Sequence, residues 1–186
     1  MKVFFTASIV QREGLLREYQ AIVDAVKKLG HELLMAGDVM NVSLEEVLNP
    51  DPKKQETYFR LWQKTINSAQ IGVVEVSFPS TIHIGTEIAA LVERDKPVIC
   101  LYTKGRDPFF TGEFHYSRFV KLEYDVETVE EVLKWGLEEV ERMMNRRFTF
   151  FVSPEIDDYL SKISHRKGLP RSEYIRNLIL KDMKRK

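Results

Sequence analysis

Short runs of apolar residues alternate along this chain with longer segments in which apolar residues recur every three or four positions. The runs cover residues 2–7, 31–35, 71–76, 97–102 and 118–122. Such short runs are typical of buried strands, and the three- and four-residue spacing is typical of amphipathic helices. The alternation therefore predicts βαβ units and an α/β fold with a mostly parallel five-stranded sheet.

The helical segments differ in how clearly they are marked. Between the first two runs one apolar stripe ends at Gly30, a natural helix stop. Its members are Leu15, Leu16, Tyr19, Ile22, Val23, Val26 and Leu29. Further helices are expected near residues 53–68 and 126–144, whereas residues 36–52 contain glycine and proline and predict an irregular connection.

The last forty residues follow a different pattern, so we expect two domains, 1–145 and 146–186. Residues 147–152 alternate in the manner of a strand, and two helices separated by Gly168 follow. Pro170 suits the first turn of the second helix. The apolar stripe of the first helix consists of Ile156, Tyr159, Leu160 and Ile163, and the residues expected to be buried in the second are Tyr174, Ile175, Leu178 and Ile179.

Charge and cysteine content bear on the binding partner and on the cellular compartment. The chain has 28 basic and 28 acidic residues, but residues 146–186 hold 11 basic and 5 acidic side chains. A basic tail suggests a polyanionic partner, although a solvated helical tail would look the same. The single cysteine, Cys100, lies in an apolar run and is expected to pack in the core, which excludes a disulfide framework and favours the cytoplasm. Neither a membrane span nor a signal peptide is expected.

Candidate chemistry gathers where strands are expected to end. In an open parallel sheet, ligands bind beyond the carboxyl ends of the strands. The segments in question are residues 6–10 and 77–87, and the second brings Glu87 to the expected first turn of a helix. A carboxylate there is either a nucleophile or a charge that complements the helix dipole.

The residues at these strand ends carry a resemblance to a known family. The motifs are Phe4-Phe5-Thr6-Ala7-Ser8-Ile9, then Val73-Val74-Glu75-Val76-Ser77-Phe78-Pro79-Ser80, and finally Gly85-Thr86-Glu87-Ile88-Ala89. Over residues 1–140 the chain resembles the nucleoside 2-deoxyribosyltransferase family, especially its 2'-deoxynucleoside 5'-phosphate N-hydrolase branch. The resemblance implies a flavodoxin-like, doubly wound sheet and cleavage of the N-glycosidic bond of a deoxynucleoside or its 5'-monophosphate.

The resemblance also assigns roles. Glu87 takes the place of the nucleophile, which traps the oxocarbenium-like sugar carbon as the base departs. Ser8 and Ser80 match positions that hydrogen-bond phosphate or sugar, and Thr6 and Ser77 join them as expected ligand contacts. Gly85 would let the backbone approach the sugar. Glu75 is expected to act at the site by orienting Ser77 or a ligand hydroxyl, with a structural role equally open. No cofactor and no metal are expected.

Three positions depart from the family pattern. Its acidic residue on the helix before the third strand falls here at Trp62, and its arginine two residues after the matched serine becomes Val10, with Arg12 nearby. The segment before Gly85 is one residue longer and contains His83. This histidine is a hypothetical proton donor for the leaving base, and the alternative is an exposed loop histidine.

The tail resembles the ribbon-helix-helix domain of small bacterial repressors, most clearly in Lys167-Gly168-Leu169-Pro170-Arg171-Ser172-Glu173-Tyr174-Ile175-Arg176. A strand and two short helices bury too little surface to fold alone, so a homodimer is expected. The residues expected to face DNA are Arg147, Thr149, Phe151, Arg171 and Ser172. Phe151 lacks the hydrogen-bonding capacity that reading bases requires, so a purely dimerising tail is the alternative.

Two functions therefore stand open. The first is a deoxyribosyltransferase-like N-glycosidase whose tail forms the dimer. The alternative is a DNA-binding regulator that binds a nucleotide without turning it over.

Overall fold

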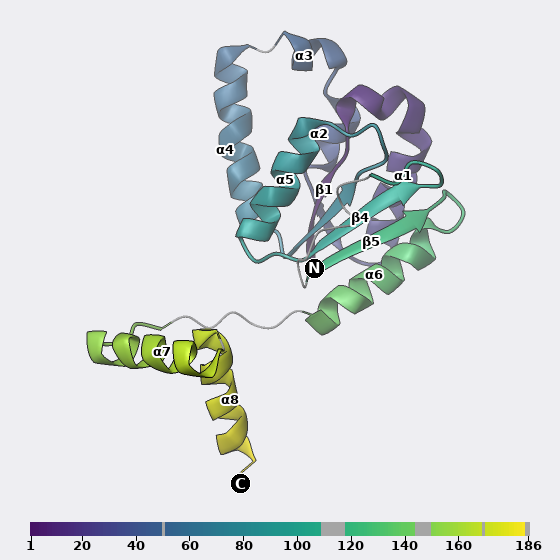
Figure 1. The fold of residues 1–186 in the computed structure, drawn as a ribbon. Helices are drawn as coiled ribbons and strands as arrows, with labels where there is room; N and C mark the ends of the chain where they lie inside the picture. The colour runs from purple at the N-terminus through teal and green to yellow at the C-terminus, as the bar shows by residue number, and fades with distance from the viewer. Residues whose placement is uncertain (50, 109–117, 144–149, 169, 185–186) are drawn as a thin grey trace. The chain divides into compact units, whose positions relative to one another are not determined.

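A computed structural model describes the chain except for residues 50, 109–117, 144–149, 169 and 185–186 (Figure 1). Its contacts divide the chain into two compact units, Met1–Asn145 and Arg146–Lys186. The sheet belongs to the first unit.

The first unit is built on five parallel strands. These are β1 (Lys2–Thr6), β2 (Glu32–Leu34), β3 (Ile71–Glu75), β4 (Val98–Thr103) and β5 (Phe119–Tyr124), in the order β2-β1-β3-β4-β5. Every neighbouring pair is parallel. Each predicted run forms a strand, and the order is the flavodoxin-like one, so the predicted fold class of this unit is confirmed.

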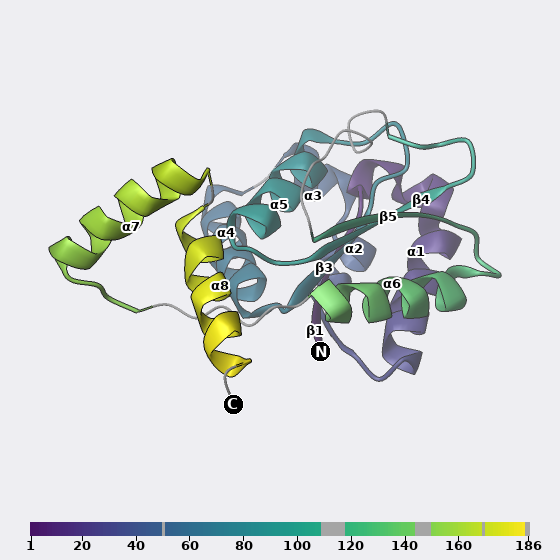
Figure 2. The same cartoon turned by 60° about the horizontal axis from the view of Figure 1, so that its bottom comes forward.

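Helices cover both faces of the sheet (Figures 1 and 2). On one face α1 (Arg12–Lys28) and α6 (Val129–Met143) pack on alternate strand residues such as Phe5 and Val73. On the other, α4 (Pro52–Ser68) and α5 (Ile82–Glu93) pack on the intervening residues, including Phe4 and Cys100. Cys100 is fully buried, as expected of a packing residue.

The connection expected to be irregular instead contains two short helices, α2 (Ala36–Asn41) and α3 (Leu44–Leu48). Ser43 caps α3 in a reciprocal box: its Oγ accepts from the Glu46 N–H at 3.1 Å, and its own N–H donates to Glu46 Oε2 at 3.0 Å. Arg12 Nη1 holds α2 by donating to the carbonyls of Val39 and Val42. These helices are too short for the apolar spacing to reveal them, and a 3-10 turn at Ile9–Gln11 escaped prediction for the same reason.

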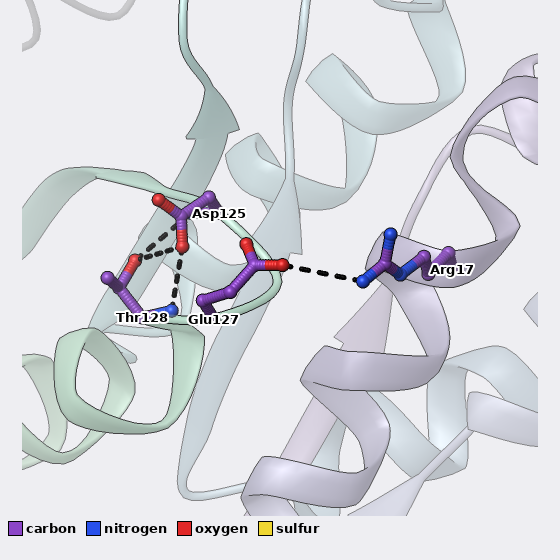
Figure 3. A network of polar contacts seen from close by, with 4 residues as sticks. All are labelled: Arg17, Asp125, Glu127 and Thr128. Atoms are coloured by element: carbon purple, nitrogen blue, oxygen red, sulfur yellow. Dashed lines mark hydrogen bonds and ion pairs between the residues drawn. The ribbon is translucent and has the colours of Figure 1, made fainter.

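The helix expected from residue 126 begins at Val129, because Asp125 and Thr128 form a turn before it (Figure 3). Asp125 Oδ1 accepts from both the backbone N–H and the hydroxyl of Thr128, each at 2.7 Å. These hydrogen bonds lower the pKa of Asp125. Beside them Glu127 reaches Arg17 of α1 at 3.4 Å, an exposed pair that stabilises the unit little.

The second unit contains α7 (Pro154–Lys167) and α8 (Arg171–Met183). Gly168 ends α7 with a φ of 62°, as predicted. Of the predicted strand, residues 147–149 with Arg147 and Thr149 lie outside the described residues. The described residues 150–152 are not in a strand, since a ribbon strand needs a partner strand and one copy of the chain supplies none.

Burial in this unit is lower than predicted. Leu160 and Ile163 are buried, but Leu178 is 48% exposed, Ile179 is 55% exposed, and Ile156 and Tyr159 are about half exposed as well. The prediction of buried side chains at Leu178 and Ile179 is therefore wrong for a single chain, because two helices have too little surface to cover them.

In the described part of the chain, no helix combines the length and the apolar character needed to cross a lipid bilayer.

The close approach of α5 to β3 depends on Gly72, and it generates a stability prediction. A Cβ at Gly72 would overlap Leu91 Cδ1 on α5. We expect Gly72→Ala to cost about 1–3 kcal/mol and Leu91→Ala about 2–5 kcal/mol of unfolding free energy. The double variant should cost clearly less than their sum, because shortening Leu91 makes room for the new methyl group. Urea unfolding of the four proteins measures this coupling, and strictly additive losses would contradict the contact.

Candidate functional site

Polar residues from two central strands meet at the carboxyl edge of the sheet. Thr6 ends β1 and Ser8 follows it, and both are buried. Glu75 ends β3 and Ser77 follows it, each 2% exposed. The strand order reverses at β1, because β2 lies on one side of it and β3 on the other. Open parallel sheets commonly bind ligands at the carboxyl edge beside such a reversal.

Glu87 reaches this edge from α5. The sequence had suggested that Glu87 lies in the first turn of this helix. The helix begins at Ile82, however, so Glu87 lies in its second turn. The dipole of a helix acts mainly on its first turn, so the capping explanation of this carboxylate loses its basis. The side chain instead makes two specific hydrogen bonds.

These two bonds join three elements. Glu87 Oε2 accepts from the Thr6 hydroxyl of β1 at 2.6 Å, and Oε1 accepts from Trp62 Nε1 of α4 at 3.1 Å. The indole N–H can only donate, whereas the hydroxyl can donate or accept. When Glu87 is protonated, the proton therefore belongs on Oε2, where Thr6 can accept it.

The surroundings of Glu87 set its ionisation. Burial raises its pKa from 4.5 to about 7, and the hydrogen bonds from Thr6 and Trp62 act in the opposite direction. Near neutral pH the carboxyl group is thus divided between its two forms. Such a group can serve as a nucleophile when ionised and can exchange a proton with its surroundings.

Aromatic side chains of α4 border the carboxylate. Trp62 stacks on Phe59, with ring centroids 5.6 Å apart and planes 23° apart. Tyr58 lies on the same side of the helix, four residues before Trp62. Its pKa is raised to about 12, mainly by burial and then by the negative charges of Glu87 and Asp38. Sequence reasoning missed Tyr58 and Phe59, although their spacing from Trp62 was a visible signal.

Glu75 sits in a second, buried network. Its Oε1 accepts from the hydroxyl of Ser77 and from the Ser77 N–H at 3.3 Å, while the Tyr124 hydroxyl lies 3.5 Å away. Thr103 N–H donates to Ser77 Oγ at 2.9 Å. Burial raises the pKa of Glu75. The expected contact between Glu75 and Ser77 is thus present, and it ties the end of β3 to β4.

The other expected site residues are less closely joined. Ser80 and Gly85 are exposed, and a Cβ at Gly85 would meet nothing within 4 Å, so no close approach demands glycine there. His83 is exposed in the first turn of α5, four residues before Glu87, and not in a loop. The hydroxyl of Ser8 is enclosed and has no hydrogen-bond partner among the described residues.

Arg106, which sequence reasoning also missed, connects three loops at this edge. It lies after β4, and its backbone carbonyl accepts from the Phe78 N–H at 2.7 Å. Its Nε donates back to the Phe78 carbonyl at 2.7 Å, and its Nη2 donates to Gln11 Oε1. The loops after β1, β3 and β4 are thereby held together by one side chain.

A shallow depression of about 780 Å³ lies elsewhere, over the outer surface of α1. Glu13, Arg17 and Val126 are among the residues that line it, and none of the expected site residues does. It is therefore distinct from the Glu87 site.

Known proteins that are similar to this chain include a relative in sequence and a relative in structure. "Putative 2'-deoxynucleoside 5'-phosphate N-hydrolase 1" of Methanococcoides burtonii is 29% identical over 103 residues, which are 55% of this chain and 80% of that protein. The structure of the Clostridium botulinum CMP N-glycosidase BcmB matches 74% of this chain and 99% of its own, with a TM-score of 0.50 and 16% identity. No family model matches the chain.

The first similarity supports the resemblance to the deoxyribosyltransferase-like family, and the second shows a shared fold. Neither supports the ribbon-helix-helix resemblance, so the domain identity of the tail stays a prediction. The role of each site residue is likewise still a prediction.

The raised pKa of Glu87 generates a prediction about stability. Since the folded state binds this proton more tightly than the unfolded state, the contribution of Glu87 to stability falls as pH rises from 4.5 through about 7. Glu87→Gln removes that loss, so its stability relative to the native protein should increase by roughly 2–3 kcal/mol between pH 5 and pH 8. Urea unfolding at the two pH values measures the change. Glu93→Gln, an exposed position on the same helix, is the control, and an identical pH response of Glu87→Gln and this control would contradict the assignment.

Proposed function

We propose that the chain is an N-glycosidase that cleaves or transfers the base of a 2'-deoxynucleoside or its 5'-monophosphate, with Glu87 as the nucleophile. The observation that carries the proposal is the placement of Glu87. A carboxylate in the second turn of α5 is oriented by Thr6 and Trp62 at the ligand-binding edge of the sheet. The resemblance of the strand-end motifs and the similarity to the M. burtonii protein support the same activity.

The reaction takes two steps. In the first, an oxygen of ionised Glu87 bonds to the sugar carbon C1' as the C1'–N bond breaks and its electron pair leaves with the base. In the second, water attacks C1' and releases Glu87, or a second base attacks and is transferred. Thr6 and Trp62 orient the carboxylate, and each of its oxygens keeps a lone pair for the reaction.

The departing base needs a proton, and α4 offers an indole where the family has an acid. General acid assistance is commonly worth about 10² to 10⁴ in rate, so a slow enzyme is expected unless a substitute acts. His83, exposed one helical turn before Glu87, stays the hypothetical donor for that proton. An aromatic border of Tyr58, Phe59 and Trp62 would offer the base a stacking surface.

Release of free base tests the activity directly. We expect turnover of at least one of the four deoxynucleosides or their 5'-monophosphates, and a loss of roughly 10³-fold or more in Glu87→Ala. Glu93→Ala, on the exposed face of the same helix, should keep native activity. Chromatography of the reaction mixture measures free base. Binding of a nucleotide by equilibrium dialysis with no base released would overturn the glycosidase and favour the non-catalytic regulator.

We further propose that the tail joins two copies of the chain. Apolar side chains remain exposed on it, and among the described tail residues only Leu160 and Ile163 have buried apolar side chains. The exposed set comprises Phe150, Phe151, Ile156, Tyr159, Leu178, Ile179, Leu180 and Met183. Arg171 pairs with Asp157 at 2.5 Å, but both side chains are about half exposed, so the arginine stays accessible. The exposed apolar set supports dimerisation, and DNA binding stays a prediction for Arg147, Thr149, Arg171 and Ser172.

Sedimentation at micromolar concentration tests the dimer. We expect twice the 21.8 kDa mass of one chain. Ile179→Lys should shift the protein toward monomer, since the lysine would place an uncompensated charge in an apolar interface. Lys181→Ala, an exposed change on the same helix, should leave the dimer intact. A native protein that sediments as a monomer would refute this role of the tail.

A further inference from the structure

Glu87 is a half-buried carboxylate, and the two side chains that hydrogen-bond it are neutral. Thr6 and Trp62 donate to it, and in the described ranges it forms no ion pair. Burying an ionised carboxylate without a cation is unfavourable, and this burial is the main cause of its raised pKa. A ligand that brings a positive charge to the carboxylate would offset much of that penalty.

The aromatic rings of α4 near this carboxylate lie in negative surroundings. Tyr58 is 43% exposed and Phe59 is 54% exposed, so a ligand can reach both rings. The negative charges of Glu87 and Asp38 both raise the pKa of Tyr58, and no basic side chain of the described residues is among the causes of that shift. Asp38, on α2, is half-buried and forms no ion pair within the part of the chain that the structure describes. The face of an aromatic ring is itself negative, so rings next to two carboxylates are suited to a cation.

Two basic residues of α4 lie close to Tyr58 along the chain, and both are engaged elsewhere. Arg60 comes two residues after Tyr58, about 200° around the helix, and pairs with Glu56 at 2.6 Å. Lys54, one turn before Tyr58, lies 3.8 Å from Glu46. These two cations therefore have carboxylates of their own.

Thr6, Trp62 and Tyr58 are all poorly suited to give a proton to a departing base. A threonine hydroxyl and an indole N–H are not acidic near neutral pH, and the pKa of Tyr58 is raised to about 12. A neutral base leaves as an anion unless it is protonated, so its departure is slow without an acid. A base that already carries a positive charge leaves as a neutral molecule and needs no proton.

We propose that the site prefers a nucleoside whose base carries a positive charge, such as an N7-alkylated purine, and releases that base without acid assistance. The inference rests on the proposed function, and it names the class of base that the sequence left open. Glu87 bonds to C1' as the C1'–N bond breaks, and the electron pair of that bond neutralises the charge of the base. Water then attacks C1', Glu87 leaves as a carboxylate, and the proton of the water goes to solvent. Tyr58 and Phe59 hold the cationic base by cation–π contacts.

Two nucleosides that differ by one methyl group test the preference. 2'-Deoxyadenosine is neutral, whereas 7-methyl-2'-deoxyadenosine carries a fixed positive charge. Once the rate with Glu87→Ala is subtracted as background, the native protein should release 7-methyladenine about 10² to 10⁴ times faster than adenine. Equal rates for the two bases would overturn the inference and leave the proposed function standing.

The contribution of the negative surroundings is tested by Asp38→Asn, which removes a charge and keeps the shape of the side chain. This change should raise KM for 7-methyl-2'-deoxyadenosine about 3- to 10-fold and leave KM for 2'-deoxyadenosine nearly unchanged. Glu56→Gln removes an exposed charge from the opposite side of α4 and should affect neither nucleoside. Equal increases for the two nucleosides in Asp38→Asn would assign Asp38 a structural role and overturn its part in the preference.

A second measurement does not depend on turnover. 1-Methylnicotinamide is a cation, and nicotinamide is its neutral counterpart. At pH 8, where Glu87 is mostly ionised, the cation should raise the Tm of the native protein and of Glu56→Gln more than nicotinamide does, and this difference should vanish in Glu87→Gln. If no nucleoside releases base but the cation still stabilises the native protein in this way, the proposed function fails and the cation site stands. Equal Tm responses of the native protein to the two compounds overturn the site, whether or not the variants fold.

Discussion

The hydrogen-bonded carboxylate of Glu87 is the constraint that holds the first unit together at the carboxyl edge of its sheet. Thr6 of β1 and Trp62 of α4 both donate to it, so one side chain of α5 connects the sheet to two helices. One turn farther along the same helix, Leu91 packs directly against Gly72 of β3. A group that burial pushes toward neutrality is held in a defined orientation by two donors. The same two hydrogen bonds thus connect the three elements and orient the carboxylate.

The indole at position 62 would affect the proposed reaction in two ways. It cannot give a proton to a leaving base, because its N–H is not acidic, but it can fix the carboxylate and present an aromatic surface. With Phe59 stacked on it and Tyr58 one turn before it, α4 presents apolar rings to the site in place of a second carboxylate. A single carboxylate without a like-charged neighbour escapes the repulsion that two would share, so burial dominates its pKa.

Most of the fold followed from the spacing of apolar residues, because five buried strands and their crossover helices need regular patterns. The short helices α2 and α3 did not follow from that spacing. Hydrogen bonds from Arg12 hold α2, and capping by Ser43 stabilises α3. At the site, sequence motifs picked out Glu87 but placed it one turn too early. They missed Arg106, because the residues that its side chain hydrogen-bonds, Phe78 and Gln11, lie 28 and 95 residues away along the chain. Such contacts exist only once the strand ends have come together.

The two units differ in what stabilises them, and this difference separates assembly from chemistry. The sheet unit has two apolar cores of its own, one on each face. The tail leaves about half of the surface of Leu178 and Ile179 exposed, so its stability depends on what covers them. A partner that covers this surface would stabilise the tail, while Glu87, Thr6 and Trp62 all come from the sheet unit of one chain. Loss of the proposed assembly should then reduce the stability of the tail before it alters the orientation of the carboxylate, because both hydrogen bonds described for that carboxylate come from residues of the sheet unit.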